Sequence, residues 1–207
     1  MKLLPVALNI ENKPCLVVGG GLVAQRKVTS LLECGAQVTV VAPELCDAFV
    51  PMLAEIKHLA RPFQAGDCAE QHLVFACTNN PAVNAAIAHE AQAHGIWCNV
   101  ADDASLSDFH SAATVRRDAI TIGITTAGQS PALARHLKMQ IEGCIGPEYE
   151  ALLEIMGSQR ASLKQKLETQ AERAELWRAI LDSEALALLR QGQRSAAEAL
   201  IDKLLNL

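Results

Sequence analysis

Short apolar runs alternate with longer stretches of helical character across roughly residues 13–117. The runs have the length and continuous hydrophobicity of strands buried on both faces, and they lie at 15–18, 37–41, 73–77 and 96–100. The helical stretches, 22–34 and 81–94, are each followed directly by a glycine, the residue that commonly ends a helix. Strands separated by helices in this way predict parallel β-α-β units with right-handed crossovers, and therefore the α/β fold class.

A different pattern follows residue 108. Segments 109–117 and 119–126 are expected to form two strands joined by a short turn. Ser130 caps the next predicted helix, which has Pro131 in its first turn and runs to about residue 142. The predicted linker after this helix contains Gly143, Gly146 and Pro147.

From residue 148 onward the pattern is helical throughout, with no strand signal. Gly192 is expected to end one helix, and Ser195 with Glu198 has the spacing of a capping box for the last one. This part of the chain therefore predicts a small helical domain, whose simplest role is packing or contact between subunits.

Composition narrows the class of protein. The chain has 207 residues and a net charge of -5, and 50% of its residues are hydrophobic, which supports a packed core. No apolar run approaches the roughly 20 residues that cross a bilayer, and the N-terminal segment lacks a signal-peptide cleavage site. The acidic balance and 3% aromatic content argue against nucleic-acid binding. Seven scattered cysteines without a CxxC pair are expected to be reduced, buried thiols of a cytoplasmic protein.

The first chemical signal is a glycine loop directly after the first predicted strand. Gly19 and Gly21 occupy the glycine positions of a G-x-G-x-x-A motif, Leu22 and Val23 lie between them and Ala24, and a helix follows. Glycines allow the backbone to approach a diphosphate, and the N–H groups of the helix N-terminus attract its negative charge. The loop therefore predicts a dinucleotide site, and an ordinary glycine turn is the alternative.

The acidic residue expected after the second strand of such a site is displaced. Pro43 stands near that point, and Glu44 follows it. Two interpretations of Glu44 are open: it bonds the ribose hydroxyls, or it lies in the first turn of the next helix, where an acid is favoured in any case. No arginine lies nearby to accept a 2′-phosphate, which favours NAD over NADP.

Several motifs in series resemble one family, the NAD-dependent precorrin-2 dehydrogenases, which include the N-terminal module of siroheme synthase. The resemblance covers about the first 145 residues and lies in segments 4–35, 76–80, 98–102 and 125–135, with Asn84. It implies a homodimer whose protomer has three parts, and the pattern of the chain indicates the same divisions. These are an NAD-binding Rossmann domain at 1–108, a dimerisation region at 109–146 and a helical C-terminal domain at 147–207.

The resemblance implies dehydrogenation of precorrin-2 to sirohydrochlorin, with hydride transfer to NAD⁺ and loss of a proton. Asp102 matches the acidic residue of the family's active site, and it follows a predicted strand at its carboxyl end, where α/β sheets bind ligands. The alternative is that Asp102 and Asp103 are loop acids that cap a turn. Thr78 and Asn79 belong to a matching motif and are expected at the cofactor.

The substrate implied by the resemblance is a polycarboxylate, so basic residues are expected around it. The candidates are His110, Arg116 and Arg135, with Arg117 and Lys138 as further ones. Thr126 matches a serine that contacts substrate in the multifunctional enzyme, although Ala127 replaces a glycine usual there. Arg26 and Lys27, in the first helix, are expected to support the fold.

Some members of the family also insert Fe²⁺ or Co²⁺ into the product, and the sequence does not decide this point. No Cys/His cluster has the spacing of metal ligands, so no resident metal is expected. A second interpretation of the whole chain is a regulatory module that binds NAD(H) and senses redox state without turnover.

Overall fold

The computed structural model describes residues 2–167 and 169–205 and divides into two compact units, Met1–Ser111 and Ala112–Leu207. The division of the second unit at 146/147 and the boundary at 108/109 remain predictions.

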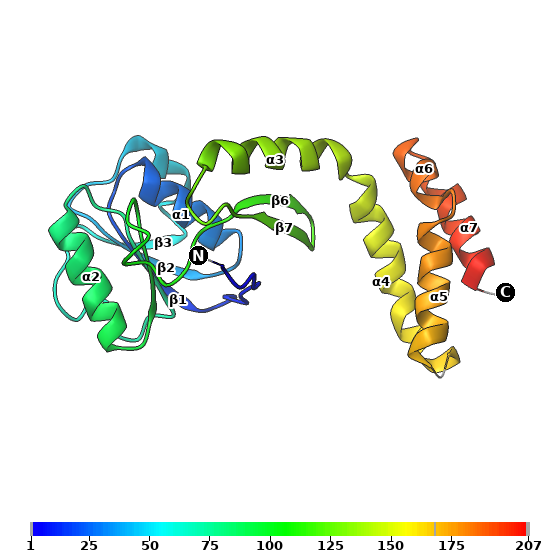
Figure 1. Cartoon of the computed structure of the whole chain (residues 1–207), viewed down its shortest axis with the longest axis horizontal. Helices are drawn as coiled ribbons and strands as arrows, with labels where there is room; N and C mark the ends of the chain where they lie inside the picture. Colours follow the sequence, from blue (N-terminus) through cyan, green and yellow to red (C-terminus); the bar gives the residue numbers. More distant parts are fainter. Residues whose placement is uncertain (1, 168, 206–207) are drawn as a thin grey trace. The chain divides into compact units, whose positions relative to one another are not determined.

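The first unit is built on a five-stranded parallel sheet with the order β3-β2-β1-β4-β5. Figure 1 labels β1, β2 and β3 of this sheet. The strands are β1 Pro14–Val18, β2 Gln37–Val41, β3 Ile56–Leu59, β4 Leu73–Ala76 and β5 Trp97–Val100. In the register, Val18 lies opposite both Val41 and Ala76, and Ala76 lies opposite Val100. The carboxyl ends of four strands therefore meet at one edge, where ligands bind in open α/β sheets.

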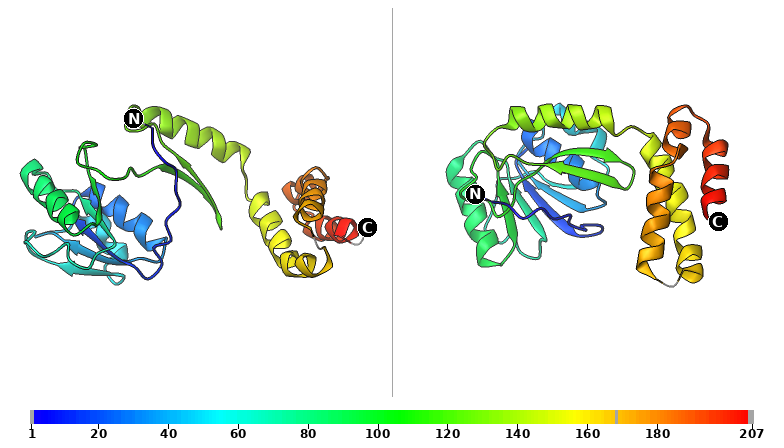
Figure 2. Two further views of the ribbon diagram at one scale, coloured as in Figure 1. Left: turned by 60° about the horizontal axis from the view of Figure 1, so that its bottom comes forward. Right: turned by 45° about the vertical axis from the view of Figure 1, so that its right-hand side comes forward.

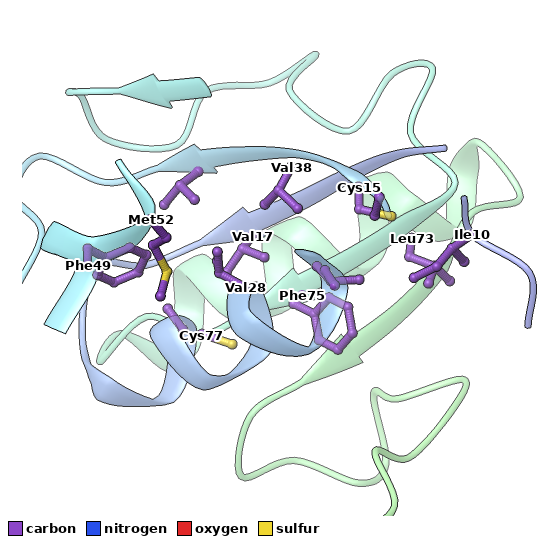
Figure 3. Close-up of a cluster of buried hydrophobic side chains, with 14 residues drawn as sticks. Ile10, Cys15, Val17, Val28, Val38, Phe49, Met52, Leu73, Phe75 and Cys77 are labelled. Carbon is purple, nitrogen blue, oxygen red and sulfur yellow. The ribbon is translucent and has the colours of Figure 1, made fainter. Parts of the chain in front are cut away.

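Helices cover both faces of this sheet, and successive side chains of β1 belong to the apolar clusters on opposite faces. Helix α1, Leu22–Leu32, packs with Val17 in one cluster, which Figure 3 shows with Val28 beside the strand. Helix α2, Pro81–Ala93, packs with Leu16 and Val18 on the other face. Burial on both faces explains why the predicted strands are continuously apolar, and the α/β fold class is confirmed.

One strand and one short helix were not predicted. β3 pairs only with β2, at the sheet edge, and Lys57 and His58 interrupt its apolar pattern. The 3₁₀ helix η1, Asp47–Met52, contains Pro51, which cannot continue a regular helix.

The second unit begins with the predicted hairpin. β6, Ala113–Arg117, and β7, Ile120–Ile124, pair antiparallel, and Asp118 adopts a φ of 47° in the turn. Helix α3, Pro131–Cys144, begins as expected, because the Ser130 side chain accepts a hydrogen bond from the Leu133 N–H at 3.2 Å.

The predicted linker begins too early. Gly143 lies inside α3, which ends beside the guanidinium of Arg117. This group donates hydrogen bonds to the carbonyls of Glu142 at 3.3 Å and Ile145 at 2.9 Å, and so satisfies acceptors that a helix C-terminus leaves free.

Four helices complete the second unit, and Figure 2 shows them packed against one another. They are α4 Glu148–Lys166, α5 Gln170–Leu181, α6 Ala185–Arg190 and α7 Arg194–Leu205. The predicted capping box is wrong: Ser195 lies inside α7, and Glu198 pairs with Arg194 at 2.9 Å. The capping box of this unit is at α5, where Thr169 and Glu172 satisfy each other's backbone N–H groups.

Candidate dinucleotide site

The glycine loop connects β1 to α1 at the carboxyl edge of the sheet. Gly19 donates a hydrogen bond to the Val41 carbonyl at 2.9 Å and has a φ of 128°. A Cβ at Gly19 would overlap the Cys77 carbonyl, and a Cβ at Gly20 would overlap the Glu44 carbonyl. Two neighbouring segments therefore press against the loop and require glycine at both positions.

Gly21 differs from its two neighbours because a Cβ there would meet nothing within 4 Å. It is the N-cap of α1 but supplies no side-chain cap, and the first turn of the helix contains no acidic residue. There is therefore open space beside this helix end, and no carboxylate of the first turn competes for its backbone N–H groups. These residues fit the diphosphate of a dinucleotide.

A pocket of about 620 Å³ opens over this loop. It contains five of the predicted cofactor residues, Gly19, Gly21, Pro43, Thr78 and Asn79. Leu22, Val23 and Glu44 do not line it: Leu22 is exposed, and Val23 packs against the core on the α1 side. The assignments of individual residues to the cofactor remain predictions.

The pocket also has walls that the sequence did not indicate. They are Gly20, Pro62, Phe63, Asn80, Ala82, Val83 and Ala86. Asn80 could have been found, because an asparagine directly before Pro81 is a helix N-cap signal, and its side chain accepts from the Ala82 and Val83 N–H groups. Phe63 lies in a loop without periodicity, so only the folded chain brings it here.

A closed hydrogen-bond network shapes the floor of the pocket between β4 and α2. The hydroxyl of Thr78 donates to Asn84 Oδ1 at 2.7 Å, and Asn84 Nδ2 donates to the Thr78 carbonyl at 3.0 Å. Asn84 is buried, so this pairing satisfies polar groups that would otherwise lack partners. The Thr78 side chain is thus held by the protein, while Asn79 beside it is exposed to the pocket.

The two open interpretations of Glu44 are reduced to one by the position of the next helix. η1 begins at Asp47, which supplies the acid of its first turn, so Glu44 does not lie in that turn. Glu44 is exposed, and its carbonyl abuts Gly20. Its side chain remains the candidate for the ribose hydroxyls.

Asp102 and Asp103 follow β5 and play different parts in the loop. Asp103 Oδ1 accepts hydrogen bonds from the Ser105 hydroxyl at 2.6 Å and the Ser105 N–H at 2.9 Å. These bonds hold the pKa of Asp103 below its usual value. Asp102 is exposed, and its charge helps to raise the pKa of the Cys77 thiol. The turn-capping interpretation therefore describes Asp103, whereas Asp102 is presented to solvent at the strand end.

The cysteines are all free thiols, as predicted, but one is not part of a core: Cys144 is exposed. Cys77 lines the pocket, and burial raises its pKa to about 11, so the thiol is neutral at physiological pH.

His110 is the one predicted substrate residue in the first unit, and its Nε2 is buried without a hydrogen-bond partner among the described residues. Thr126, Arg116 and Arg135 lie in the second unit. Thr126 accepts a hydrogen bond from the Ser130 N–H at 3.1 Å, while Arg116 and Arg135 are exposed. Lys138 pairs with Glu142 at 3.5 Å.

The described part of the chain contains neither a cluster of metal ligands nor a membrane-spanning helix. Within residues 2–167 and 169–205, no group of three or more His, Cys, Asp or Glu side chains is placed to hold a metal ion. In the same ranges, no helix combines the length and hydrophobicity that spanning a bilayer requires.

A parallel sheet with a glycine loop and a helix N-terminus at its carboxyl edge defines a dinucleotide-binding α/β protein. Comparison with known families then identifies the particular one. Residues 6–113 match NAD_binding_7, a family of NAD(P)-binding domains, and the chain belongs to this family. Residues 148–205 match the family described as the sirohaem synthase dimerisation region. The predicted family resemblance is confirmed, and the predicted cofactor is confirmed as NAD(P).

Relatives and solved structures extend this result. The chain is 35% identical to siroheme synthase of Pseudoalteromonas translucida over all of its own length and 44% of that protein. It is 37% identical to siroheme synthase of Methylococcus capsulatus, over 97% of this chain and 43% of that protein. The chain thus spans less than half the length of these relatives. The fold is shared with SirC, precorrin-2 dehydrogenase, at a TM-score of 0.75 and 24% identity, covering 97% of this chain and 100% of that one.

Proposed function

We propose that this chain catalyses the NAD-dependent dehydrogenation of precorrin-2 to sirohydrochlorin. One observation carries the proposal: an NAD(P)-binding domain and a sirohaem synthase dimerisation region follow each other in one chain. The relatives named siroheme synthase and the shared fold of SirC, precorrin-2 dehydrogenase, support it. NAD is favoured over NADP because no basic residue is among those that line the pocket.

The residues of the chain divide the work of removing two hydrogens. NAD⁺, when bound, supplies the acceptor for the hydride. The N–H groups that begin α1 would hold the diphosphate, and the pocket walls around Cys77 and Phe63 carry no charge. The carboxylate of Asp102, exposed at the end of β5, accepts the proton that leaves the macrocycle.

The remaining assignments belong to the same proposal. Thr126, His110, Arg116 and Arg135 contact the substrate, and the protein acts as a homodimer in the cytoplasm. The region at 109–146 was predicted to form the dimer. The family described as the sirohaem synthase dimerisation region instead matches residues 148–205. The free state of all seven cysteines supports a reducing compartment.

The decisive test is to mix the protein, NAD⁺ and precorrin-2 and to follow NADH absorbance together with the formation of sirohydrochlorin. The informative variant is Asp102→Asn, because asparagine tolerates the φ of 66° at this position and removes only the charge. We expect kcat to fall by about 100-fold or more. Asp103→Asn is the matched control, and it should stay within about threefold of the unmodified protein, because Asp103 only shapes the turn.

Two results would contradict this assignment. Full activity of Asp102→Asn would remove the role of Asp102 while leaving the dehydrogenase intact. Binding of NAD(H) without any turnover of precorrin-2 would instead support the alternative of a regulatory module.

The cofactor site has its own test in Gly21→Asp. A carboxylate at the open position before α1 would repel the diphosphate, so we expect NAD affinity to fall at least about 100-fold in calorimetry. Gly143→Asp, in α3, adds the same charge at another site with open space and should leave the affinity unchanged.

A further inference from the structure

Lys27 is a half-buried cation, and none of the groups that the structure places on its charge is a carboxylate. It lies in α1, and its Nζ donates a hydrogen bond to the Ser111 hydroxyl at 2.7 Å. The same atom lies 5.5 Å from the centre of the Phe75 ring, within range of a cation–π contact. Burial lowers the pKa of Lys27, which reflects the free energy lost when a charge leaves water.

This ammonium group has no carboxylate partner in the described part of the chain. The groups that act on its charge are Cys77 and Arg26. Cys77 is a neutral thiol, because burial raises its pKa to about 11, and Arg26 is a second cation. An ammonium has three N–H donors, and Ser111 takes one of them. Support of the fold, the role expected from the sequence, leaves two donors of Lys27 unused and its charge unbalanced.

The partner of Lys27 is fixed in place by its neighbours. Asn99, buried at the end of β5, donates a hydrogen bond to the Phe109 carbonyl at 2.8 Å. The Phe109 ring meets the Phe75 ring edge-on, with centroids 5.3 Å apart and an interplanar angle of 87°. These contacts attach segment 109–111 to β4 and β5. The position of Ser111 is therefore set by the sheet, and its hydrogen bond in turn fixes the position of the Lys27 ammonium group.

The surroundings of Lys27 connect it with the proposed reaction site. Cys77 lines the dinucleotide pocket. The charge of Lys27 lowers the pKa of the Cys77 thiol and the charge of Asp102 raises it. Figure 3 shows Cys77 and Phe75 in the same cluster beside α1. His110, next to Ser111, has a buried Nε2 without a partner among the described residues. Two groups with unused hydrogen-bonding capacity, the Lys27 ammonium and His110 Nε2, therefore lie at segment 109–111.

We propose that Lys27 is a substrate-binding residue, and that its two free N–H donors bind a carboxylate of the tetrapyrrole and so position the ring. The inference rests on the proposed function for the identity of the ligand. A carboxylate would supply the negative charge that the protein itself does not place beside Lys27, and charge-assisted hydrogen bonds are the strong ones.

The test is an equilibrium titration of the full chain with sirohydrochlorin, followed by absorbance in the absence of NAD. The variant is Lys27→Met, which keeps the unbranched shape of the side chain to within one atom of its length and removes the charge. Arg26→Met is the matched control on the adjacent, exposed position. We expect the Kd of Lys27→Met to rise by about tenfold or more, and that of Arg26→Met to stay within about twofold. Lys27→Arg should recover most of the affinity.

Three further readouts separate binding from stability. NAD affinity and Tm should be unchanged or slightly raised in Lys27→Met, because the change removes a partly desolvated charge. In turnover, KM for precorrin-2 should rise more than kcat falls.

Each outcome decides the question. Equal affinity of Lys27→Met and the unmodified protein for sirohydrochlorin would refute the role of Lys27, as would a loss of affinity that Lys27→Arg does not recover. If the unmodified protein binds sirohydrochlorin but does not oxidise precorrin-2, the proposed function fails and the role of Lys27 is still judged by the ratio of affinities. If the unmodified protein does not bind the tetrapyrrole, both fail.

Discussion

The two units of this protein are stabilised in different ways. In Met1–Ser111, backbone segments touch: Gly19 and Gly20 lie against carbonyls of neighbouring loops. Two buried amides also hold loops in place, Asn84 from helix α2 and Asn99 from strand β5. In Ala112–Leu207, the helices meet through apolar side chains, and no described polar residue is buried. Of the glycines described in this unit, none has the backbone of another segment against its Cβ position.

The difference between the two units shows where the exact position of backbone groups matters. A phosphate-binding loop works only if N–H groups point to one place, and backbone contacts with buried hydrogen bonds provide that accuracy. A helical domain needs only complementary apolar faces, because volume-conserving changes in such a core are tolerated. The first unit should therefore respond sharply to small backbone changes, and the second to changes in side-chain volume.

The largest effect is expected for Gly20→Ala. The new methyl group would overlap the Glu44 carbonyl, so we expect the free energy of unfolding of the first unit to fall by about 3 kcal/mol or more. The same change in α4, Gly157→Ala, meets open space inside a helix and should stabilise by about 0.5–1 kcal/mol. Urea unfolding can follow each unit separately, because Trp97 is in the first and Trp177 in the second and each can be replaced in turn by phenylalanine. Similar effects of both alanines would contradict the comparison.

Ile201→Ala tests the packing of the second unit. The side chain is fully buried among the helices, so we expect the free energy of unfolding to fall by about 3 kcal/mol. The unfolding transition reported by Trp177 measures this change. Leu181→Ala, at an exposed position in α5, should cost less than about 1 kcal/mol. NAD affinity should be unchanged in both, and a weaker affinity in Ile201→Ala would show that the units depend on each other.

Alkaline pH should destabilise the first unit selectively. Burial raises the pKa of Cys15 and Cys77 to about 11 and that of Cys98 to about 12, whereas the pKa of a thiol in the unfolded chain is near its ordinary value of 9.0. The unfolded chain therefore releases these protons first, and stability falls as pH rises from about 9 towards 12. The slope is at most about 1.4 kcal/mol per pH unit for each thiol.

Unfolding midpoints in reductant at pH about 8 and about 10 measure this loss. Cys98→Ala should flatten the pH dependence, and Cys144→Ala, which removes an exposed thiol of the second unit, should not. A steeper dependence in the Trp177 transition than in the Trp97 transition would contradict the assignment.

The smallest effect is expected at Ala127. Its φ of 50° lies in the left-handed region, where alanine is disfavoured and glycine is not. Ala127→Gly should therefore stabilise the loop by about 0.5–1 kcal/mol, measured as a rise in Tm. Ala132→Gly, in the first turn of α3, is the control and should lower Tm, because there glycine only adds freedom to the unfolded chain.

Much of the fold could be read from local signals. The runs that became β1, β2, β4 and β5 are continuously apolar, and Gly35 and Gly95 end their helices with positive φ, as expected from position. β3 was missed because an edge strand with Lys57 and His58 lacks that pattern. The capping-box prediction at Ser195 was wrong because the motif is only a pair of residues three positions apart, and that spacing also occurs inside a helix such as α7.

At the site, sequence motifs predicted where the glycine loop lies, but they did not predict the contacts of its individual residues. Gly21 was predicted, but Gly20 was treated as the variable position of the motif, and the contact with the Glu44 carbonyl that requires glycine there arises only on folding. Lys27 was assigned to the fold because its place in a helix says nothing about Ser111, which lies 84 positions further along the chain.

The amino-acid sequence alone determined the class of fold, the position of the dinucleotide loop and the family, because these depend on periodicity and on short motifs of neighbouring residues. The tertiary structure decided which glycines are irreplaceable, which of two adjacent aspartates is free, and which cation lacks a counter-charge. These properties depend on groups from distant segments meeting at atomic distance, and contacts of that kind leave no pattern within either segment.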